Sequence, residues 1–212
     1  MPKIAVHNEV ITVIVIFNVE FGVQQKLIDA IVPFLRIVKR QPGFISACIH
    51  KSTDGQKVVN YAQWRSQRDY DAFLNNAAVQ AQGKRLRDFG IADIHVYEVV
   101  VSESKIGTPT ISKKGYLAHI AEFRMVPHNQ ARMVELAKEH ILSAMTQPGL
   151  LTASFHRSLD RTRVINYGQW SSVKDFEKLR QQPGFGSDKP YWEGIAENEF
   201  HLYEVVDVQT PR

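Results

Sequence analysis

An internal duplication is the feature that most constrains the fold of this chain. Residues 41–64 read QPGFISACIHKSTDGQKVVNYAQW, and residues 147–170 read QPGLLTASFHRSLDRTRVINYGQW, with twelve of the twenty-four positions identical and no gap. Both ends of the segment are displaced by the same 106 positions, since 147 − 41 and 170 − 64 give one value. A repeat of this length indicates two copies of one folding unit, so any proposed fold must be built twice.

The same displacement extends beyond this segment. Residues 94–100 (IHVYEVV) match residues 200–206 (FHLYEVV), and Phe17 matches Phe123. The chain therefore divides into two units of about 95 to 100 residues each, which is the size of a small domain. We predict a first repeat over residues 1–104, a polar linker over 105–113 and a second repeat over 114–212.

Charge, cysteine content and hydropathy narrow the classes of protein to consider. The net charge of +4 comes without a basic run, so the chain lacks the footprint of a nucleic-acid-binding protein. Cys48 is the only cysteine and aligns with Ser154, which leaves no intrachain disulfide and no thiolate metal cluster. No apolar run approaches the ~18 residues of a membrane span, and the first residues lack a signal-peptide pattern. We expect a soluble, cytoplasmic protein that binds neither nucleic acid nor membrane.

Hydrophobic periodicity predicts the same order of elements in both repeats. A β-branched run is typical of a buried strand, whereas apolar residues at helical spacing indicate a helix, here ended by Gln-Pro-Gly. The order strand, helix, strand, strand, helix, strand is the ferredoxin-like β-α-β-β-α-β pattern, with helices on one face of an antiparallel sheet. The predicted strands are 10–20, 44–51, 57–65 and 92–101, then 115–126, the hairpin 150–171 and 199–208. The predicted helices are 24–40, a short helix that begins at 66 followed by a second helical piece to about 89, and then 129–146, 172–181 and 188–197.

Helices on one face leave the other face of each sheet uncovered. In residues 44–51 the aliphatic side chains of Ile45, Ala47 and Ile49 alternate with small or polar ones, and we expect this aliphatic set to form the uncovered face. Such a face must be buried, and the second repeat supplies the partner. We therefore predict an α+β fold in which two ferredoxin-like repeats form an intramolecular dimeric α+β barrel. Further association of this pseudo-dimer into a homodimer is left open.

A candidate site lies on the strand 57–65. Alternation places Asn60 and Trp64 on one face, where a buried amide is costly unless it is hydrogen-bonded. Tyr70 follows six residues after the tryptophan, and residues 84–87 carry three cations on a helix that must cover the same sheet. Together they predict an apolar slot between helices and sheet with an amide, an indole, a phenol and a cation.

The chain resembles the antibiotic biosynthesis monooxygenase superfamily of dimeric α+β barrels, in the tandem form with two units in one polypeptide. The resemblance spans both repeats and is carried by the Pro-Gly turns, the Asn-x-x-x-Trp strands and the closing Leu-Tyr-Glu-Val type strands. By analogy with the family's small polyketide anthrone oxygenases, it implies four catalytic residues: Asn60, Trp64, Tyr70 and Arg85. The first two would donate hydrogen bonds to the substrate, Tyr70 would act as acid or base, and Arg85 would hold the anion.

The resemblance also implies the reaction and the partners. An electron-rich aromatic substrate of the anthrone or hydroquinone type would react with O2 to give a quinone, without metal, flavin or other cofactor. The protein would keep the substrate dry, stabilise its enolate oxygen and assist one proton transfer.

The second repeat keeps only part of this residue set. It retains Asn166 and Trp170, but Phe176 replaces the tyrosine and Tyr191 replaces the arginine. We therefore expect the first pocket to be catalytic and these four residues to line a weaker substrate-binding pocket.

Other interpretations of these residues stay open. The Asn60 side chain could have a structural role, capping a β-bulge or hydrogen-bonding a helix end. Trp64 could simply fill the core, and Arg85 could be one of several cations on a solvated helix. A chain with vestigial pockets would be a non-catalytic small-molecule-binding or stress-response barrel. Haem-degrading relatives share the fold but need an axial histidine on the helix after the Trp strand, and none occurs before His95. The remaining histidines lack ligand spacing, so we predict no metal site.

Overall fold

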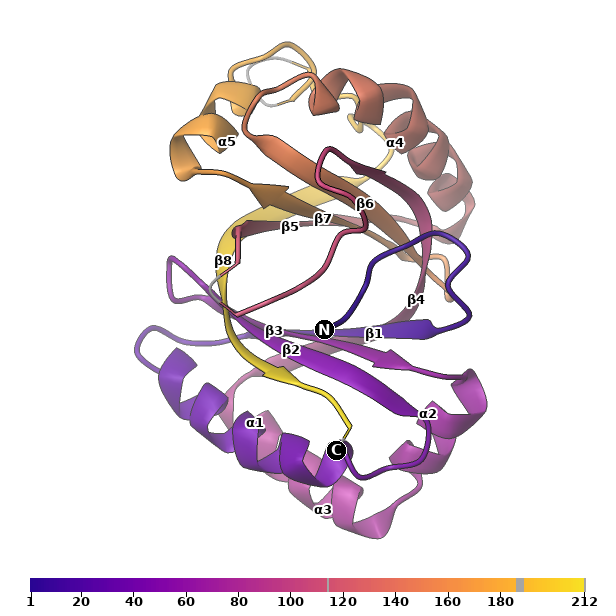
Figure 1. The fold of residues 1–212 in the computed structure, drawn as a ribbon, viewed down its shortest axis with the longest axis vertical. Helices are drawn as coiled ribbons and strands as arrows, with labels where there is room; N and C mark the ends of the chain where they lie inside the picture. Colours follow the sequence, from indigo (N-terminus) through magenta and orange to yellow (C-terminus); the bar gives the residue numbers. More distant parts are fainter. Residues whose placement is uncertain (114, 186–188, 212) are drawn as a thin grey trace.

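The computed structural model describes residues 1–113, 115–185 and 189–211 (Figure 1). The first repeat contains strands β1 (Ile11–Asn18), β2 (Phe44–Ser52), β3 (Lys57–Trp64) and β4 (Ile91–Ser104), with helices α1 (Gln24–Val38), α2 (Gln67–Leu74) and α3 (Ala77–Leu86). The second contains strands β5 (Leu117–Arg124), β6 (Leu150–Ser158), β7 (Arg163–Trp170) and β8 (Glu197–Gln209), with helices α4 (Gln130–Met145) and α5 (Val173–Arg180). The predicted order of elements is confirmed, apart from the last helix.

The Pro-Gly turn in each repeat requires glycine because a helix start packs against it. Gly43 has φ +77°, in the left-handed region that favours glycine, and a Cβ there would lie 2.2 Å from the side chain of Asp69. At Gly149 the corresponding distance to Asp175 would be 2.1 Å. A serine caps each helix by accepting a hydrogen bond of 3.2 Å from the backbone N–H of that aspartate. The repeated turn thus fixes where α2 and α5 begin.

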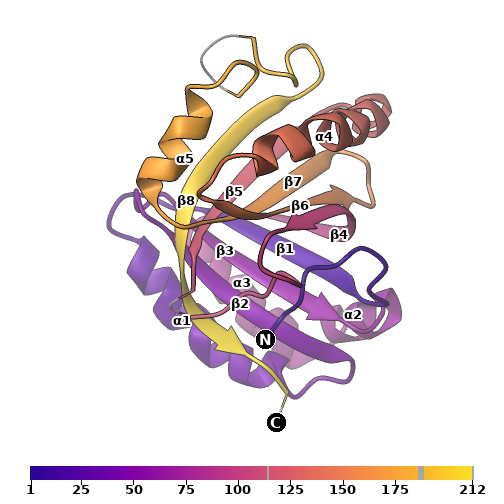
Figure 2. The ribbon, with the colours of Figure 1, turned by 45° about the horizontal axis from the view of Figure 1, so that its top comes forward.

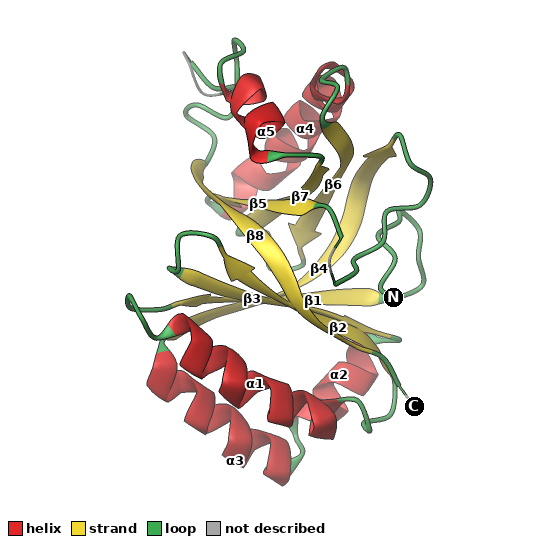
Figure 3. Ribbon diagram, turned by 60° about the vertical axis from the view of Figure 1, so that its left-hand side comes forward, coloured by secondary structure: helices red, strands yellow, loops and turns green. Residues whose placement is uncertain are grey.

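The eight strands form one closed barrel in the order β1-β3-β2-β8-β5-β7-β6-β4. The repeats join where the second half of β8 pairs with β2 and the second half of β4 pairs with β6, both antiparallel. β8 therefore runs past both sheets (Figure 2), and the helices cover the outer faces (Figure 3). This arrangement confirms the predicted intramolecular dimeric α+β barrel.

A buried layer of aromatic and polar side chains lies between the two sheets. The Tyr61 hydroxyl lies 3.0 Å from His156 Nε2, and the Tyr167 hydroxyl lies 2.9 Å from His50 Nε2. All four side chains are buried, and each pair links one repeat to the other. Because every member comes from the duplicated segment, the repeat supplies both halves of its own interface.

The expected orientation of β2 is wrong. Ala47 and Ile49 pack into the core beneath the first repeat's helices, whereas Cys48 and His50 face the other sheet. Alternation separates the two sets of side chains but does not say which set faces the helices. The inter-sheet layer accommodates His50 because its ring is hydrogen-bonded across the interface.

The helix predicted for residues 188–197 is also wrong. Residue 188 lies outside the described residues, and residues 191–195 form turns before β8 begins. Backbone hydrogen bonds here are short-range, such as Glu193 N to the Pro190 carbonyl at 2.9 Å, and Gly194 has φ +75°. A proline and a left-handed glycine prevent a continuous helix. None of the helices in the described part of the chain is long and apolar enough to cross a membrane.

The segment between the repeats is held by the start of the chain. Ile4 N donates to the Pro109 carbonyl at 2.9 Å, and Ile111 N donates to the Pro2 carbonyl at 3.1 Å. β4 continues to Ser104, where its pairing with β6 ends. Residue 114 lies outside the described residues, so the boundaries 1–104, 105–113 and 114–212 stay a prediction.

Candidate functional site

The first cavity lies between the sheet and the helices of the first repeat and has a volume of about 390 Å³. Residues of β1 and β3 line it from the sheet side, and residues of α1, α2 and α3 line it from the helix side. Most of the lining is aliphatic or aromatic. Of the four predicted catalytic residues, the structure brings three to this cavity: Asn60, Trp64 and Tyr70.

Asn60 carries a polar atom without a protein partner. Alternation along β3 points Asn60, Ala62 and Trp64 into the cavity, while Tyr61 points into the inter-sheet layer. The Asn60 Oδ1 atom is buried and has no hydrogen-bond partner among the described residues. An unsatisfied buried oxygen costs about 1–3 kcal/mol, a cost that a ligand with a hydroxyl or N–H group would remove.

Aromatic rings line the same cavity. The Trp64 ring lies 4.7 Å from that of Phe73 and 5.7 Å from that of Tyr70, measured between centroids. Burial raises the pKa of Tyr70 to about 12, and the Asp71 carboxylate adds to this rise. Its hydroxyl therefore stays protonated at neutral pH and can donate a hydrogen bond or a proton. The wall combines flat apolar surfaces with few polar groups, as expected for a site that binds a planar aromatic molecule.

Arg85 does not belong to the cavity. Its side chain is exposed, and the cations that line the cavity are Lys84 and Arg87. On a helix each residue turns by about 100°, so neighbouring positions face different directions and an error of one residue moves a side chain off the site. The cavity has cations in its lining, as expected, but they are Lys84 and Arg87 and not the predicted Arg85.

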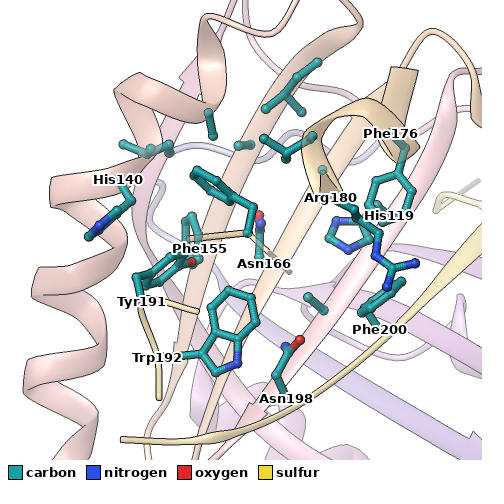
Figure 4. Close-up of a pocket in the computed structure, with 18 of the residues that line it drawn as sticks. His119, His140, Phe155, Asn166, Phe176, Arg180, Tyr191, Trp192, Asn198 and Phe200 are labelled. Carbon is teal, nitrogen blue, oxygen red and sulfur yellow. The ribbon is translucent and has the colours of Figure 1, made fainter. Parts of the chain in front are cut away.

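The second cavity occupies the equivalent place in the second repeat and has a volume of only about 120 Å³ (Figure 4). The four predicted residues, Asn166, Trp170, Phe176 and Tyr191, all line it. Three larger side chains account for its smaller size: Phe155, Trp192 and Phe200 stand 106 positions after Ile49, Leu86 and Ile94.

The polar groups of the second cavity also differ. Asn166 Oδ1 and Trp170 Nε1 are buried without a hydrogen-bond partner among the described residues. His119 lines the cavity with its ring centroid 4.6 Å from that of Phe176, and Arg180 lies 4.8 Å from the ring centroid of Phe200. Burial lowers the pKa of His119 to about 3, and the charge of Arg180 contributes to the same shift. His119 is therefore neutral at physiological pH.

Several residues of the second cavity were not predicted from the sequence. His119 was considered only as a metal ligand, and His140, which stacks on Tyr191 with ring centroids 4.5 Å apart, was not considered. The displacement of 106 aligns His119 with Val13, a position on the cavity-facing side of β1. That alignment could have revealed the histidine. Lys189 does not supply a cation to this cavity, because its side chain is exposed and pairs with Glu193.

Neither cavity lining contains a carboxylate among the described residues. The described part of the chain also holds no group of three or more His, Cys, Asp or Glu side chains that could bind a metal ion. The two linings offer hydrogen-bond donors, hydrogen-bond acceptors, aromatic faces and cations. Such groups can bind an aromatic molecule, stabilise an oxyanion and donate a proton.

Comparisons with known proteins agree with this architecture. A family model described as antibiotic biosynthesis monooxygenase matches residues 10–84 and 117–187. The tetracenomycin-F1 monooxygenase of Streptomyces glaucescens is 40% identical over 81 residues, which are 38% of this chain and 72% of that protein.

Two solved structures show the same fold. The crystal structure of an anthrone oxidase-like protein has a TM-score of 0.86 at 18% identity, over 99% of this chain and 96% of that chain. A monooxygenase-like protein from Listeria innocua has a TM-score of 0.51 at 9% identity, over 93% and 95% of the two chains. At these identities the likeness concerns the fold alone.

The two segments matched by the family model make up more than half of the chain, and each contains the Gln-Pro-Gly turn that follows its first helix and one Asn-x-x-x-Trp strand. The chain belongs to the antibiotic biosynthesis monooxygenase family and carries two of the family's domains in one polypeptide.

Proposed function

We propose that the first cavity oxidises an electron-rich polycyclic phenol or anthrone with O2 to a quinone, without metal or flavin. The observation that carries this proposal is the buried, unpartnered Oδ1 of Asn60 inside a cavity of about 390 Å³ walled by aromatic rings. The similarity to tetracenomycin-F1 monooxygenase supports a polyketide-like substrate. The second cavity, at about 120 Å³, is too small for several fused rings.

The reaction needs little beyond binding and charge stabilisation. A ring C–H of the substrate loses its proton to water, and the resulting enolate transfers one electron to O2. The two radicals join through a new C–O bond, and the hydroperoxide loses water to leave a carbonyl group. In total, a CH2 group and O2 give C=O and H2O.

Each polar group of the cavity has a role in this proposal. The Asn60 amide and the Trp64 indole bind the oxygens of the substrate, so that negative charge developing there meets hydrogen-bond donors. Tyr70, protonated because its pKa is raised to about 12, donates a proton to the peroxide oxygen as the O–O bond breaks. Lys84 and Arg87 at the exposed side of the cavity favour the enolate over the neutral substrate.

The test is an assay of dithranol or emodin anthrone with O2 and a strong chelator, followed by quinone absorbance and O2 consumption. We expect turnover by the wild-type chain and a loss of about 100-fold in Asn60→Ala, as for other single donors to a developing oxyanion. Trp64→Phe, which keeps the ring packing, separates the role of the indole N–H from that of its bulk. Unchanged turnover in both variants would contradict the proposal.

A non-catalytic binding barrel is the alternative. Such a protein would bind the anthrone in the first cavity without consuming O2. A measurable affinity together with a rate equal to the uncatalysed rate would favour it.

A further inference from the structure

The second cavity contains two buried polar atoms with opposite hydrogen-bonding needs. Asn166 Oδ1 requires a donor, and Trp170 Nε1 requires an acceptor, and neither has a partner in the described part of the chain. Both residues point to the same side of β7, with Gly168 between them. A ligand that fills the cavity must form a hydrogen bond to each of these atoms, or the free-energy cost of the unsatisfied atom remains.

The two atoms stand at separate points of the cavity. The indole leans back over Gly168, because a Cβ placed on this glycine would lie 3.3 Å from Trp170 Nε1. The same point lies 3.5 Å from His119 Nδ1. Asn166 is two residues away, or roughly 6.6 Å along the strand at ~3.3 Å per residue. One polar group of a ligand can therefore sit by Trp170 and His119, and another by Asn166.

The volume and walls select a single ring. The second cavity measures about 120 Å³, less than the roughly 150 Å³ of an apolar cavity that holds benzene, so it has room for at most one small ring. Phe155, Phe176 and Phe200 supply apolar walls (Figure 4), while neighbouring Ala121 and Gly168 leave room for a planar molecule. A fused polycyclic ligand would need several of these rings to move.

Hydrogen-bonding groups, rather than net charge, select a ligand that carries hydroxyl groups. The one cation of the described lining, Arg180, lies over the Phe200 ring. Among the described residues, the lining has no carboxylate that would attract a cation. Asn166 Oδ1 accepts hydrogen bonds only, so a fully ionised ligand oxygen would repel it. His119, uncharged at physiological pH, offers a ring nitrogen as acceptor or donor according to its tautomer. A hydroxyl can accept from Trp170 and donate to His119 at the same time.

We infer that the second cavity binds a single-ring para-dihydroxybenzene, with one hydroxyl donating to Asn166 Oδ1 and the other placed between Trp170 Nε1 and His119. This inference is independent of the reaction proposed for the first cavity, since it rests on the second repeat alone. It gives the tandem chain two sites with different ligands, a larger one in the first repeat and a smaller one in the second.

Isothermal titration of the full chain with hydroquinone tests this inference, carried out without O2 and with ascorbate present. p-Cresol and p-xylene replace one and both hydroxyls by methyl groups at nearly unchanged shape. We expect about tenfold weaker binding at each replacement, as for the loss of one hydrogen bond to a buried group. Equal affinity for all three compounds, or no binding of hydroquinone, would overturn the inference.

A matched pair of variants assigns the site. Ala121 and Val15 occupy equivalent positions, opposite Asn166 on β7 and Asn60 on β3. Ala121→Phe should fill the second cavity and weaken hydroquinone binding at least tenfold, whereas Val15→Phe should leave it unchanged. The opposite result would show that hydroquinone occupies the first cavity and would overturn the assignment.

A second variant covers the case in which Ala121→Phe fails to fold. Asn166→Leu keeps the volume and removes the acceptor, so it should weaken hydroquinone about tenfold while p-xylene binds at least as well. A parallel loss of affinity for both compounds would indicate a purely structural effect of Asn166 and would contradict the inference. Anthrone turnover by the same proteins reports on the first cavity, so failure of the proposed function is seen separately.

Discussion

Asn60 and Asn166 occupy equivalent positions in the two repeats, and each presents to a cavity an Oδ1 that has no hydrogen-bond partner among the described residues. The two cavities nevertheless differ in size and in polar groups. The first is wide, with a protonated tyrosine and cations at its exposed side. The second is narrow, with a neutral histidine and larger aromatic side chains. The duplicated strand therefore fixes the position of a cavity in each repeat, while residues from the helices and neighbouring strands determine the size of the ligand that each cavity can bind.

The largest expected effect on activity comes from exchanging a small and a large side chain between equivalent positions of the two cavities. Leu86→Trp gives the first cavity the side chain that Trp192 supplies to the second. We expect kcat/KM for the anthrone to fall about 100-fold because the ring can no longer enter, with a stability cost of about 1–3 kcal/mol for overpacking. Anthrone kinetics and a thermal melt measure the two effects. The reciprocal Trp192→Leu enlarges the second cavity, and a gain of anthrone turnover there would break the proposed division of roles.

The second prediction concerns stability at acidic pH. Burial lowers the pKa of His50 and of His156 to about 4, and His119, present only in the second repeat, has a pKa of about 3. Unfolded histidines titrate near 6.5, so as the pH falls from 6.5 towards 4 the unfolded chain binds more protons and the folded state loses stability. Each histidine contributes up to about 1.4 kcal/mol per pH unit.

The variant His119→Val installs the first repeat's residue and should reduce the slope of unfolding free energy against pH in this window. Urea unfolding at several pH values measures that slope. His119→Phe, which also lacks a titrating group, serves as a control for packing. An unchanged slope in both variants would show that His119 is not buried in its neutral form.

The third prediction exchanges Tyr70 for the residue of the second repeat. Tyr70→Phe should lower kcat for the anthrone about tenfold through loss of the proton donor, at the lower end of the effect of general acid catalysis, and should change KM little. Phe176→Tyr, the reciprocal change, should leave anthrone kinetics unaltered. Steady-state kinetics at saturating O2 separate kcat from KM. Equal kcat in Tyr70→Phe and wild type would remove the tyrosine from the proposed chemistry.

The smallest effects are expected at the exposed side of the first cavity. Lys84→Ala and Arg87→Ala should each raise KM about two- to threefold, since solvent screens exposed charges. Arg85→Ala, one residue away but outside the cavity, is the matched control and should change nothing. Measurements at low and high salt check the electrostatic origin, because the difference between the variants should shrink as salt rises.

Much of the fold was accessible from the sequence because the duplication removes most alternatives. One unit with the β-α-β-β-α-β pattern leaves a sheet face uncovered, and the second copy is the nearest partner. The orientation of β2 escaped this reasoning, since the face of Cys48 and His50 is buried through hydrogen bonds between repeats that one strand's pattern does not reveal. The turns at 191–195 were not predicted either. The spacing of apolar residues there was interpreted as a helix, although Pro190 and Gly194 are typical of turns.

The candidate site, like the fold, could be predicted from the sequence only in part. Parity along a strand has a period of two, so the sequence placed Asn60 and Trp64 on the same face of the sheet, while the structure shows that this face lies toward the helices. On a helix the direction of the side chain changes by about 100° from one residue to the next. For this reason Lys84 and Arg87 line the cavity, whereas Arg85 does not. His119 was missed because most of its strand is buried or half-buried on both faces, so burial does not show which way a single side chain points.

The central claim is that the first cavity, and not the second, receives the polycyclic substrate. A crystal structure of the chain soaked with a hydroxylated anthraquinone, the product type of the proposed reaction, tests it most directly. The proposal predicts ligand density within hydrogen-bond distance of Asn60 in the first cavity and none of that ligand beside Asn166. Density for the anthraquinone in the second cavity, with the first one empty of it, would contradict it.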